Sequence, residues 1–296
     1  MLIGLHPMVY DHHGGAAAIG PRLREVIERA EAAGVHSVWP MDHFFQIPPT
    51  RLPSSSPMLE AYAQLAWAAS FTTRLELGAL VSGVHHRPPG VLIKTVTTLD
   101  VLSGGRAWLG LGAGWNEQES RALGIPMPPI RARFEQLEET LRVARQMFDG
   151  DAAPFDGTHF TLTDPVNSPP PVRRPPILIG GSGERKTLRL VASYADACNL
   201  FDTGDPTTIR HKLDVLKRHC DDVGRSYDEI TRTALTSAPP TSEARTATLE
   251  RLDTAGIDLV IVALRDLIDD DVLDGLPDLV AQAAPLGRTS PPALQR

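Results

Sequence analysis

The chain has 296 residues, of which 42% are hydrophobic and 22% are charged, a composition typical of soluble globular proteins. A formal net charge of -7 argues against a nucleic acid or an anionic membrane as partner, because such partners require clustered lysine and arginine. No apolar run reaches the roughly 18 residues that a membrane-spanning helix needs, so that class of protein is excluded as well.

Two cysteines, Cys198 and Cys220, are too few and too far apart for a disulfide framework or a zinc ribbon. Residues 1–15 contain no basic segment followed by an apolar stretch, so we expect no signal peptide. The expectation is therefore a reducing, cytoplasmic setting with a small-molecule substrate as the partner. A homodimer is left open.

Eight short apolar runs, rich in β-branched residues, recur along the chain and are predicted to form strands. Each is nearly continuous rather than alternating, which is typical of strands buried on both faces of a parallel sheet. The runs are 2–5, 35–41, 75–81, 106–112, 175–181, 196–201, 230–235 and 257–264.

Each run is followed by a segment in which apolar residues recur at helical spacing. In the first segment, Pro21 suits the first turn of a helix and Gly34 suits its end. Eight strand–helix units of about 37 residues are what a (β/α)8 barrel requires. A doubly wound sheet is the second choice, because it normally uses fewer strands at this length. The predicted helices are 21–34, 58–70, 91–105, 132–150, 185–195, 207–224, 242–256 and 269–283.

Two segments are longer than a barrel needs, and long loops in a compact domain are usually lids or binding loops. Residues 42–57 follow the second run and are too rich in proline and serine for regular structure. Residues 150–175 are an insertion before the fifth strand, in which 155–162 is predicted to form a small hairpin. No domain boundary is visible, so we predict one barrel domain over 1–286 and a loosely ordered tail over 287–296.

Three glycine-rich motifs nearly match known catalytic signatures, and each fails at a residue that the chemistry needs. GLGAGW resembles a dinucleotide fingerprint, but Trp115 stands where the third glycine must allow close packing. IGGSGERKT resembles a phosphate loop, but Arg185 replaces the glycine before Lys-Thr. GGSGE has Glu184 where a serine-hydrolase nucleophile elbow needs glycine. The corresponding functions are therefore set aside.

The segment Gly180, Gly181, Ser182, Gly183 follows the fifth predicted strand and leads into a helix. Its backbone N–H groups can approach an anion closely, with the positive end of the helix behind them. We therefore predict that it binds a phosphate, and a glycine-rich turn without a ligand is the alternative.

The ten histidines are candidates for a metal site or for acid–base chemistry. Adjacent pairs such as His85-His86 point in different directions and seldom chelate one ion, so we predict no metal site. His43 lies beside Asp42 where the second strand ends, and barrel active sites form at that edge. His43 is the predicted catalytic residue. The alternative is that the pair merely caps the strand end.

Five segments of the sequence carry a family resemblance. They are AEAAGVHSVWPMDHFF, LGALVSG, TLDVLSGGRAWLGLGAGWNEQE, ARFEQLEET and PPILIGGSGERKTLRLVASYADACNL, and the likeness extends over about residues 1–265. Together they resemble the bacterial luciferase-like flavin monooxygenase superfamily. The DHF element and GGSGERKTLRL are most similar to its coenzyme F-420-dependent oxidoreductases. The resemblance implies a luciferase-like TIM-type barrel with a deazaflavin, or alternatively FMN, across its carboxyl-terminal face.

Carried over position by position, the resemblance implies a set of site residues. It places Asp42 at the deazaflavin ring and His43 beside the reacting carbon, as a proton donor or acceptor. It also implies a cis peptide bond between Leu80 and Val81, where the third strand bulges toward the ring. Residues after the fourth strand would line the ring edge, and the glycine-rich loop would hold the phosphate. The implied cofactor-binding residues are Asp42, Leu80, Val81, Gly112, Ala113, Gly180, Gly181, Ser182 and Gly183.

One departure concerns the sugar-phosphate dehydrogenase branch of the family, which has a glutamate soon after the fourth strand as a second catalytic group. Trp115 stands at that position here, and the nearest acids are Glu117 and Glu119. The residues that bind the substrate phosphate in that branch do not map onto this sequence. The sugar-phosphate substrate is therefore not carried over.

The predicted function is hydride transfer between F-420 and a small organic substrate, with His43 supplying or accepting one proton. With FMN, reaction of the reduced flavin with oxygen would make the protein a monooxygenase. A flavin-binding protein without turnover and a metal-dependent barrel hydrolase are the remaining alternatives. Arg185 and Lys186, beside the glycine-rich loop, would favour the acidic tail of F-420 over FMN.

Overall fold

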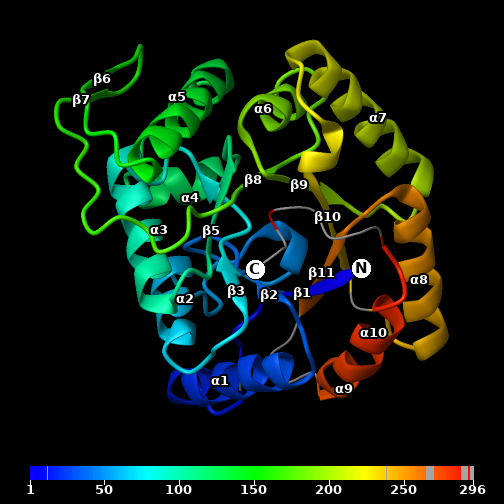
Figure 1. Ribbon diagram of the computed structural model, residues 1–296. Helices are drawn as coiled ribbons and strands as arrows, with labels where there is room; N and C mark the ends of the chain where they lie inside the picture. Colours follow the sequence, from blue (N-terminus) through cyan, green and yellow to red (C-terminus); the bar gives the residue numbers. More distant parts are fainter. Residues whose placement is uncertain (12, 238, 265–269, 288–292, 294–296) are drawn as a thin grey trace.

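A computed structural model describes the fold over residues 1–11, 13–237, 239–264, 270–287 and 293. Parallel strands form a barrel that is ringed by helices (Figure 1). The barrel strands are β1 (Leu2–Pro7), β2 (Ser37–Val38), β3 (Glu76–Gly78), β4 (Ser82–Gly83), β5 (Ala107–Gly112), β8 (Ile177–Gly180), β9 (Ala197–Phe201), β10 (Thr231–Ser237) and β11 (Leu259–Leu264).

The strands pair in the order β3-β2-β1-β11-β10-β9-β8-β5-β4, and a further pairing of β3 with β5 closes the barrel. Every pairing in this sheet is parallel, so all strands deliver their carboxyl ends to one face. Each of the eight predicted runs contains barrel strand, and the predicted (β/α)8 fold is confirmed. The run 35–41 is reduced to β2, because Pro40 has no N–H to continue the ladder.

Helices occur in all eight predicted segments, and the last segment is divided into two short helices by Gly275. The helix α4 and two 3-10 turns, η1 and η2, were not predicted. The elements are α1 (Ala16–Ala32), η1 (Pro48–Thr50), α2 (Ala61–Ala69), α3 (Pro89–Ser103), α4 (Glu117–Ala122), α5 (Ile130–Phe148), α6 (Thr187–Tyr194), α7 (Pro206–Val223), η2 (Tyr227–Glu229), α8 (Ser242–Ala255), α9 (Asp270–Asp274) and α10 (Leu276–Ala283). In the described residues, no helix is long and apolar enough to cross a membrane.

The first helix starts earlier than its sequence predicts. Pro21 was expected in the first turn, whereas α1 begins five residues before it, at Ala16. The segment Ala16, Ala17, Ala18 has the highest intrinsic helix propensity, which favours extension of the helix toward the amino terminus. Pro21 then lies inside the helix on its exposed side, where its missing N–H removes one backbone hydrogen bond.

The third barrel strand is interrupted at the position that the family resemblance implies. Residues 79–81 separate β3 from β4, and the Leu80–Val81 peptide bond is cis, as expected. The bulge presses against the next strand, because a Cβ on Gly110 would lie 1.9 Å from the carbonyl oxygen of Ala79. Glycine at 110 is thus what allows the interrupted strand to sit beside β5.

Two tryptophans fill the interior of the barrel. Trp39 and Trp108 are fully buried and pack edge to face, with ring centroids 5.5 Å apart. The indole N–H of Trp108 donates to Glu76, whose carboxylate also pairs with Arg173. With Leu178 and other apolar side chains they form a buried cluster inside the barrel.

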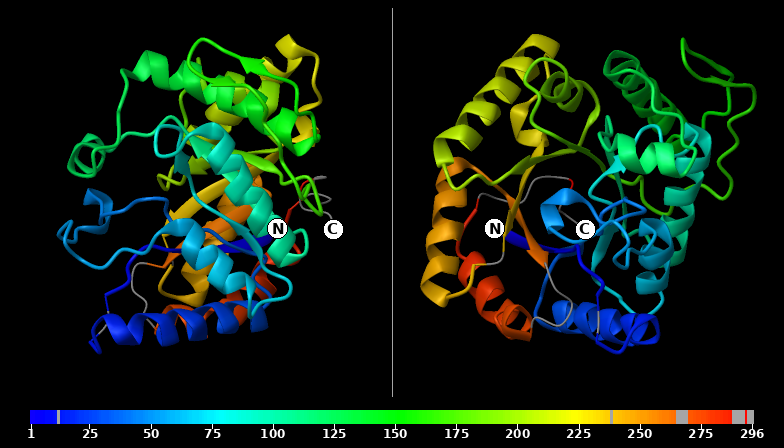
Figure 2. Two further views of the ribbon diagram at one scale, coloured as in Figure 1. Left: turned by 90° about the vertical axis from the view of Figure 1, so that its left-hand side faces the viewer. Right: turned by 180° about the vertical axis from the view of Figure 1, so that it is seen from behind.

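The two long loops are found where they were predicted. Loop 42–57 contains the short turn η1, and the insertion 150–175 contains the predicted hairpin, with strands β6 (Phe155–Asp156) and β7 (Thr161–Leu162). In the side view, loop 42–57 projects from one end of the barrel and the N-terminus lies at the other (Figure 2). The single-domain assignment stays a prediction, and most of the tail 287–296 lies outside the described residues.

Candidate active site

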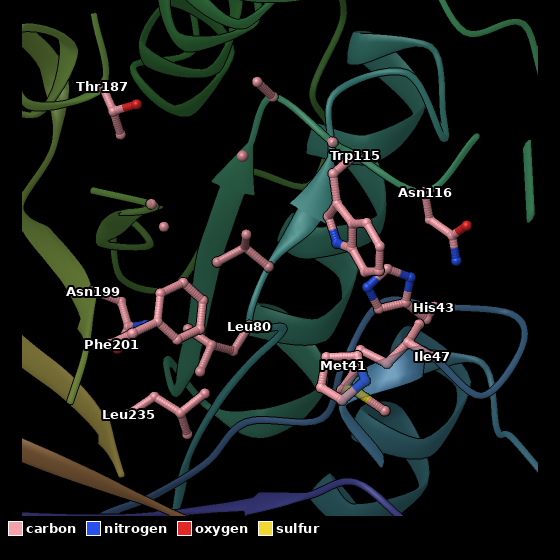
Figure 3. A pocket seen from close by; sticks show the side chains of 18 of the residues that line it. Met41, His43, Ile47, Leu80, Trp115, Asn116, Thr187, Asn199, Phe201 and Leu235 are labelled. Atoms are coloured by element: carbon pink, nitrogen blue, oxygen red, sulfur yellow. The ribbon is translucent and has the colours of Figure 1, made fainter. Parts of the chain in front are cut away.

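A cavity of about 640 Å³ opens at the carboxyl ends of the strands (Figure 3). Its size is in the range of small-molecule and cofactor sites. Nearly every barrel strand contributes to its wall. The lining residues are His6, Met8, Met41, His43, Ile47, Pro49, Leu80, Val81, Gly83, His86, Gly112, Ala113, Gly114, Trp115, Asn116, Ile130, Phe134, Leu137, Gly180, Gly181, Gly183, Thr187, Asn199, Phe201, Asp202, Leu235, Thr236, Ser237 and Ala263.

His43, the predicted catalytic residue, lines this cavity directly after β2. Its Nδ1 is hydrogen-bonded to Oε2 of Glu119 at 2.9 Å, which leaves Nε2 as the ring nitrogen for a ligand. Trp115 packs edge to face on the imidazole with centroids 5.6 Å apart, as the close-up shows (Figure 3). The side chain is therefore held in one orientation by a carboxylate and an indole.

Glu119 is the functional candidate that the sequence did not single out. Its side chain is fully buried, and its Oε1 accepts the backbone N–H groups of Phe44 and Phe45. Burial raises the pKa of this carboxyl, but the His43 hydrogen bond and the two amides outweigh burial, so the net pKa lies below its usual value. Glu119 is thus an anion beside His43 at neutral pH.

The fold explains why Glu119 can reach His43 although Trp115 occupies the earlier position. Asn116 accepts the N–H of Glu119 and starts α4, so the chain turns helical immediately after β5. Glu119 is the third residue of α4, and its carboxylate accepts the backbone N–H groups of Phe44 and Phe45 in loop 42–57. The sequence offered two signals. Glu119 is one of the two acids nearest the position of the family's second catalytic glutamate, and its spacing from Asn116 resembles a capping box, which indicates a helix start but no partner.

Asp42 is placed differently from its prediction. Its side chain is 1% exposed and does not line the cavity. Arg87 donates to both carboxylate oxygens, at 2.6 and 2.9 Å, and His86 Nδ1 lies 3.6 Å from Oδ2. Burial raises the pKa of Asp42, yet its contacts with His86 and with the Arg87 guanidinium outweigh burial and hold the pKa far below its ordinary value. Direct contact with a ring is not supported by this position, and Asp42 instead anchors the start of loop 42–57 through Arg87.

The remaining predicted site residues gather around the cavity, with one exception. In the close-up, Leu80 lies between His43 and Phe201, and Thr187, which follows the glycine-rich loop, lies on the opposite side of the cavity from His43 (Figure 3). Ser182 is exposed and does not line the cavity, whereas Thr187, which was not predicted, does. The predicted residues that do line it are His43, Leu80, Val81, Gly112, Ala113, Gly180, Gly181 and Gly183.

The loop after β8 forms a cradle without side chains. Gly181 has a φ of +115°, which L-residues rarely adopt. A Cβ on Gly183 would lie 2.9 Å from Oγ1 of Thr187, the first residue of α6. Any larger residue there would fill the cradle, so the loop fits an anionic group approaching the start of α6. The flavin-type phosphate expected from the sequence is compatible with this shape.

Acidic and histidine side chains are not arranged for a metal. Among the described residues, no three histidine, cysteine, aspartate or glutamate side chains are grouped so that they could hold an ion. His85 donates to or accepts from Ser120 at 3.0 Å, and burial lowers its pKa to about 4.

His6 lies on the cavity floor and remains uncharged. Burial lowers the pKa of His6 to about 4, although its hydrogen bond with the Trp39 carbonyl opposes the shift. Between that value and the ordinary pKa of 6.5, the unfolded chain binds a proton at His6 that the folded protein does not. The free energy of unfolding must therefore fall as the pH falls through this window.

We expect wild-type protein to be less stable at pH 5 than at pH 7, with roughly 2 kcal/mol of the difference coming from His6. Urea unfolding at both pH values measures this. His6→Asn should remove that share of the pH dependence, whereas His13→Asn, at an exposed site, should retain it. Equal pH dependence in the His6 and His13 variants would contradict the assignment.

Comparison with known proteins agrees with this geometry. Residues 6–261 match the family model of the luciferase-like monooxygenases. The F420-dependent glucose-6-phosphate dehydrogenase of Kineococcus radiotolerans is 30% identical over 179 residues, which is 60% of this chain and 52% of that protein. The chain thus spans about half the length of this relative.

Solved structures show the same fold at low sequence identity. An F420-dependent secondary alcohol dehydrogenase, in complex with an F420-acetone adduct, superimposes with a TM-score of 0.81 at 18% identity, over 95% of this chain and 98% of that one. The oxygenating constituent of 3,6-diketocamphane monooxygenase from Pseudomonas putida, in complex with FMN, gives 0.74 at 15% identity, over 98% and 99%. Deazaflavin and flavin proteins therefore share this architecture.

Proposed function

Since the chain belongs to the luciferase-like monooxygenase family, we propose that it is a coenzyme F-420-dependent oxidoreductase acting on a small organic substrate. The observation that carries the proposal is the His43–Glu119 pair, which faces a cavity bordered by the cis Leu80–Val81 bulge. The sequence relatives that are F420-dependent dehydrogenases support the deazaflavin over FMN.

The residues present fit such a cofactor. The cradle after β8 would hold the phosphate, and Leu80, Val81 and Gly112 would form the surface beneath the ring. Arg185 and Lys186 flank the cradle, where they would attract the acidic tail of F-420. When bound, a deazaflavin supplies a carbon that accepts or donates a hydride, which is the difficult part of the chemistry.

The contribution of the protein is a positioned proton carrier. Nε2 of His43 would accept the proton that a substrate hydroxyl loses on oxidation, or return it to a carbonyl oxygen on reduction. Glu119 fixes the tautomer through Nδ1 and stabilises the protonated imidazole by its charge. Trp115 and the apolar walls keep water from the reacting atoms.

We expect F-420 to bind about tenfold or more tightly than FMN. Fluorescence titration of each cofactor with the purified protein measures the two Kd values. The double variant Arg185→Gln/Lys186→Gln should weaken F-420 binding more than FMN binding, because only F-420 carries the acidic tail. Arg24→Gln, at an exposed arginine of α1, is the matched control.

Tight binding of FMN without binding of F-420 would transfer the assignment to a flavin monooxygenase. The second test is turnover: steady-state assays with reduced F-420 or reduced FMN and a panel of acceptors follow oxidation of the cofactor. Cofactor binding without turnover of any acceptor in the panel would leave a flavin-binding protein instead of an enzyme.

A further inference from the structure

We infer that the substrate is a neutral and largely apolar molecule bearing one hydroxyl or carbonyl group, rather than a sugar phosphate or another anion. The inference rests on the proposed function and goes further by assigning the substrate class from the cavity wall. It separates this chain from its glucose-6-phosphate dehydrogenase relatives.

The cavity wall lacks the cations that an anionic substrate needs. Among the lining residues that the structure describes there is no lysine or arginine. Burying a phosphate dianion without such partners is costly, and enzymes provide arginine or lysine for it. Away from the glycine-rich cradle, which the proposed function gives to the cofactor, a sugar phosphate would therefore find no lysine or arginine among the described lining residues.

Arginines close to the cavity already have partners. Arg87 donates to Asp42 and Glu60 and lies behind the wall. Arg251 donates to both oxygens of Asp202 at 2.7 Å, which also neutralises the one carboxylate in the lining. Neither guanidinium can turn to a substrate without leaving a buried carboxylate uncompensated.

Two further cationic side chains, Arg133 and Lys186, are not part of the cavity wall. Arg133 donates from Nη1 to the carbonyl oxygen of Gly114 and does not line the cavity. Lys186 Nζ lies 5.1 Å from the centroid of the Phe134 ring, beside the cradle that the proposed function gives to the cofactor. Among the described residues, these cations are thus paired within the protein or lie beside the cradle that the proposed function gives to the cofactor.

Around His43 the cavity wall is mainly apolar, and its polar members there, Asn116 and His86, carry no fixed positive charge of the lysine or arginine kind. Met41, Ile47 and Trp115 surround the imidazole, and Phe201 and Leu235 face it across Leu80 (Figure 3). Trp115 and Phe201 both line the cavity and are 53% and 57% exposed, so both rings are accessible to a molecule in it. A substrate with an apolar body would cover both rings while its single oxygen reaches Nε2 of His43.

The test measures binding as well as turnover. The secondary alcohols from 2-butanol to 2-octanol, and glucose 6-phosphate as the anionic probe, are titrated by calorimetry into protein loaded with whichever cofactor binds. Affinity should rise about fourfold for each added methylene, which is the gain for one buried CH₂ group. Glucose 6-phosphate should bind at least about tenfold more weakly than 2-octanol and should not be oxidised.

A pair of lysine variants tests whether the alcohol binds at the part of the cavity next to Phe201. Phe201→Lys places a charge in the apolar part of the cavity and should reduce the affinity for 2-octanol by about tenfold or more. Val172→Lys makes the same change at a residue that is 65% exposed and outside the cavity, and should leave the affinity unchanged. Circular dichroism of both variants verifies that they fold.

The inference is overturned if glucose 6-phosphate binds as tightly as 2-octanol, if affinity does not depend on chain length, or if the two lysine variants behave alike. These outcomes differ from failure of the proposed function, which the cofactor titration without alcohol reveals. A protein that binds F-420 but prefers the phosphate retains its proposed cofactor and loses only the apolar substrate.

Discussion

His43→Ala is expected to lower kcat by about 10²- to 10⁴-fold, because the reaction loses its positioned proton carrier. Cofactor affinity should change little, because His43 lines the cavity on one side only. The free energy of unfolding should fall by no more than about 1–3 kcal/mol, the cost of removing one hydrogen bond from the buried Glu119 carboxylate. Stopped-flow or steady-state assays give kcat, and titration of the cofactor gives Kd for the same preparation.

Glu119→Gln should also reduce kcat, but by a smaller factor than His43→Ala. The amide can still contact Nδ1 of His43 but no longer carries the negative charge that stabilises the protonated ring. Glu117→Gln is the matched control, because Glu117 is on the same helix and does not line the cavity. Full turnover in His43→Ala, or a loss of unfolding free energy beyond about 3 kcal/mol, would support the strand-cap alternative instead.

The periodicity of apolar residues was sufficient to predict the barrel fold but not the interruption of its third strand. Strands buried on both faces have a signal strong enough to locate all eight positions, and the helices between them follow from apolar spacing. The break between β3 and β4 has no signal in composition, because Leu80 and Val81 are ordinary strand residues. It was expected only from the family resemblance.

Sequence order predicted the candidate site residues that directly follow the end of a strand. It did not reveal contacts between residues that are far apart in the sequence. His43 and the glycine loop have fixed positions relative to β2 and β8, so sequence order places them. Glu119 contacts a residue 76 positions away, and Arg87 contacts Asp42 across 45 positions. Neither pairing has a local pattern, so the sequence could not tell that Asp42 turns away from the cavity.

The buried Asp42–Arg87 pair leads to the second large effect. Arg87→Met leaves a fully buried carboxylate without its main cation, and breaking such a pair costs about 3–5 kcal/mol of unfolding free energy. The loss should be greatest at neutral pH. It should diminish as the pH falls through the pKa of Asp42 in the variant, which burial raises above the ordinary 3.8 once Arg87 is gone.

Urea unfolding at neutral pH measures this loss, and two further variants define its origin. Asp42→Asn/Arg87→Met removes both charges and should recover part of the stability, because the uncompensated carboxylate is gone. Arg131→Met breaks an exposed pair with Glu135 on α5 and should change the free energy of unfolding little, because solvent screens such a pair. Asp42 directly precedes His43, so loss of its partner in Arg87→Met should disturb the position of His43 at the start of loop 42–57. Arg87→Met should therefore also lower kcat, whereas Arg131→Met should not. If Arg87→Met were as stable as Arg131→Met, the Asp42–Arg87 pair would not anchor loop 42–57.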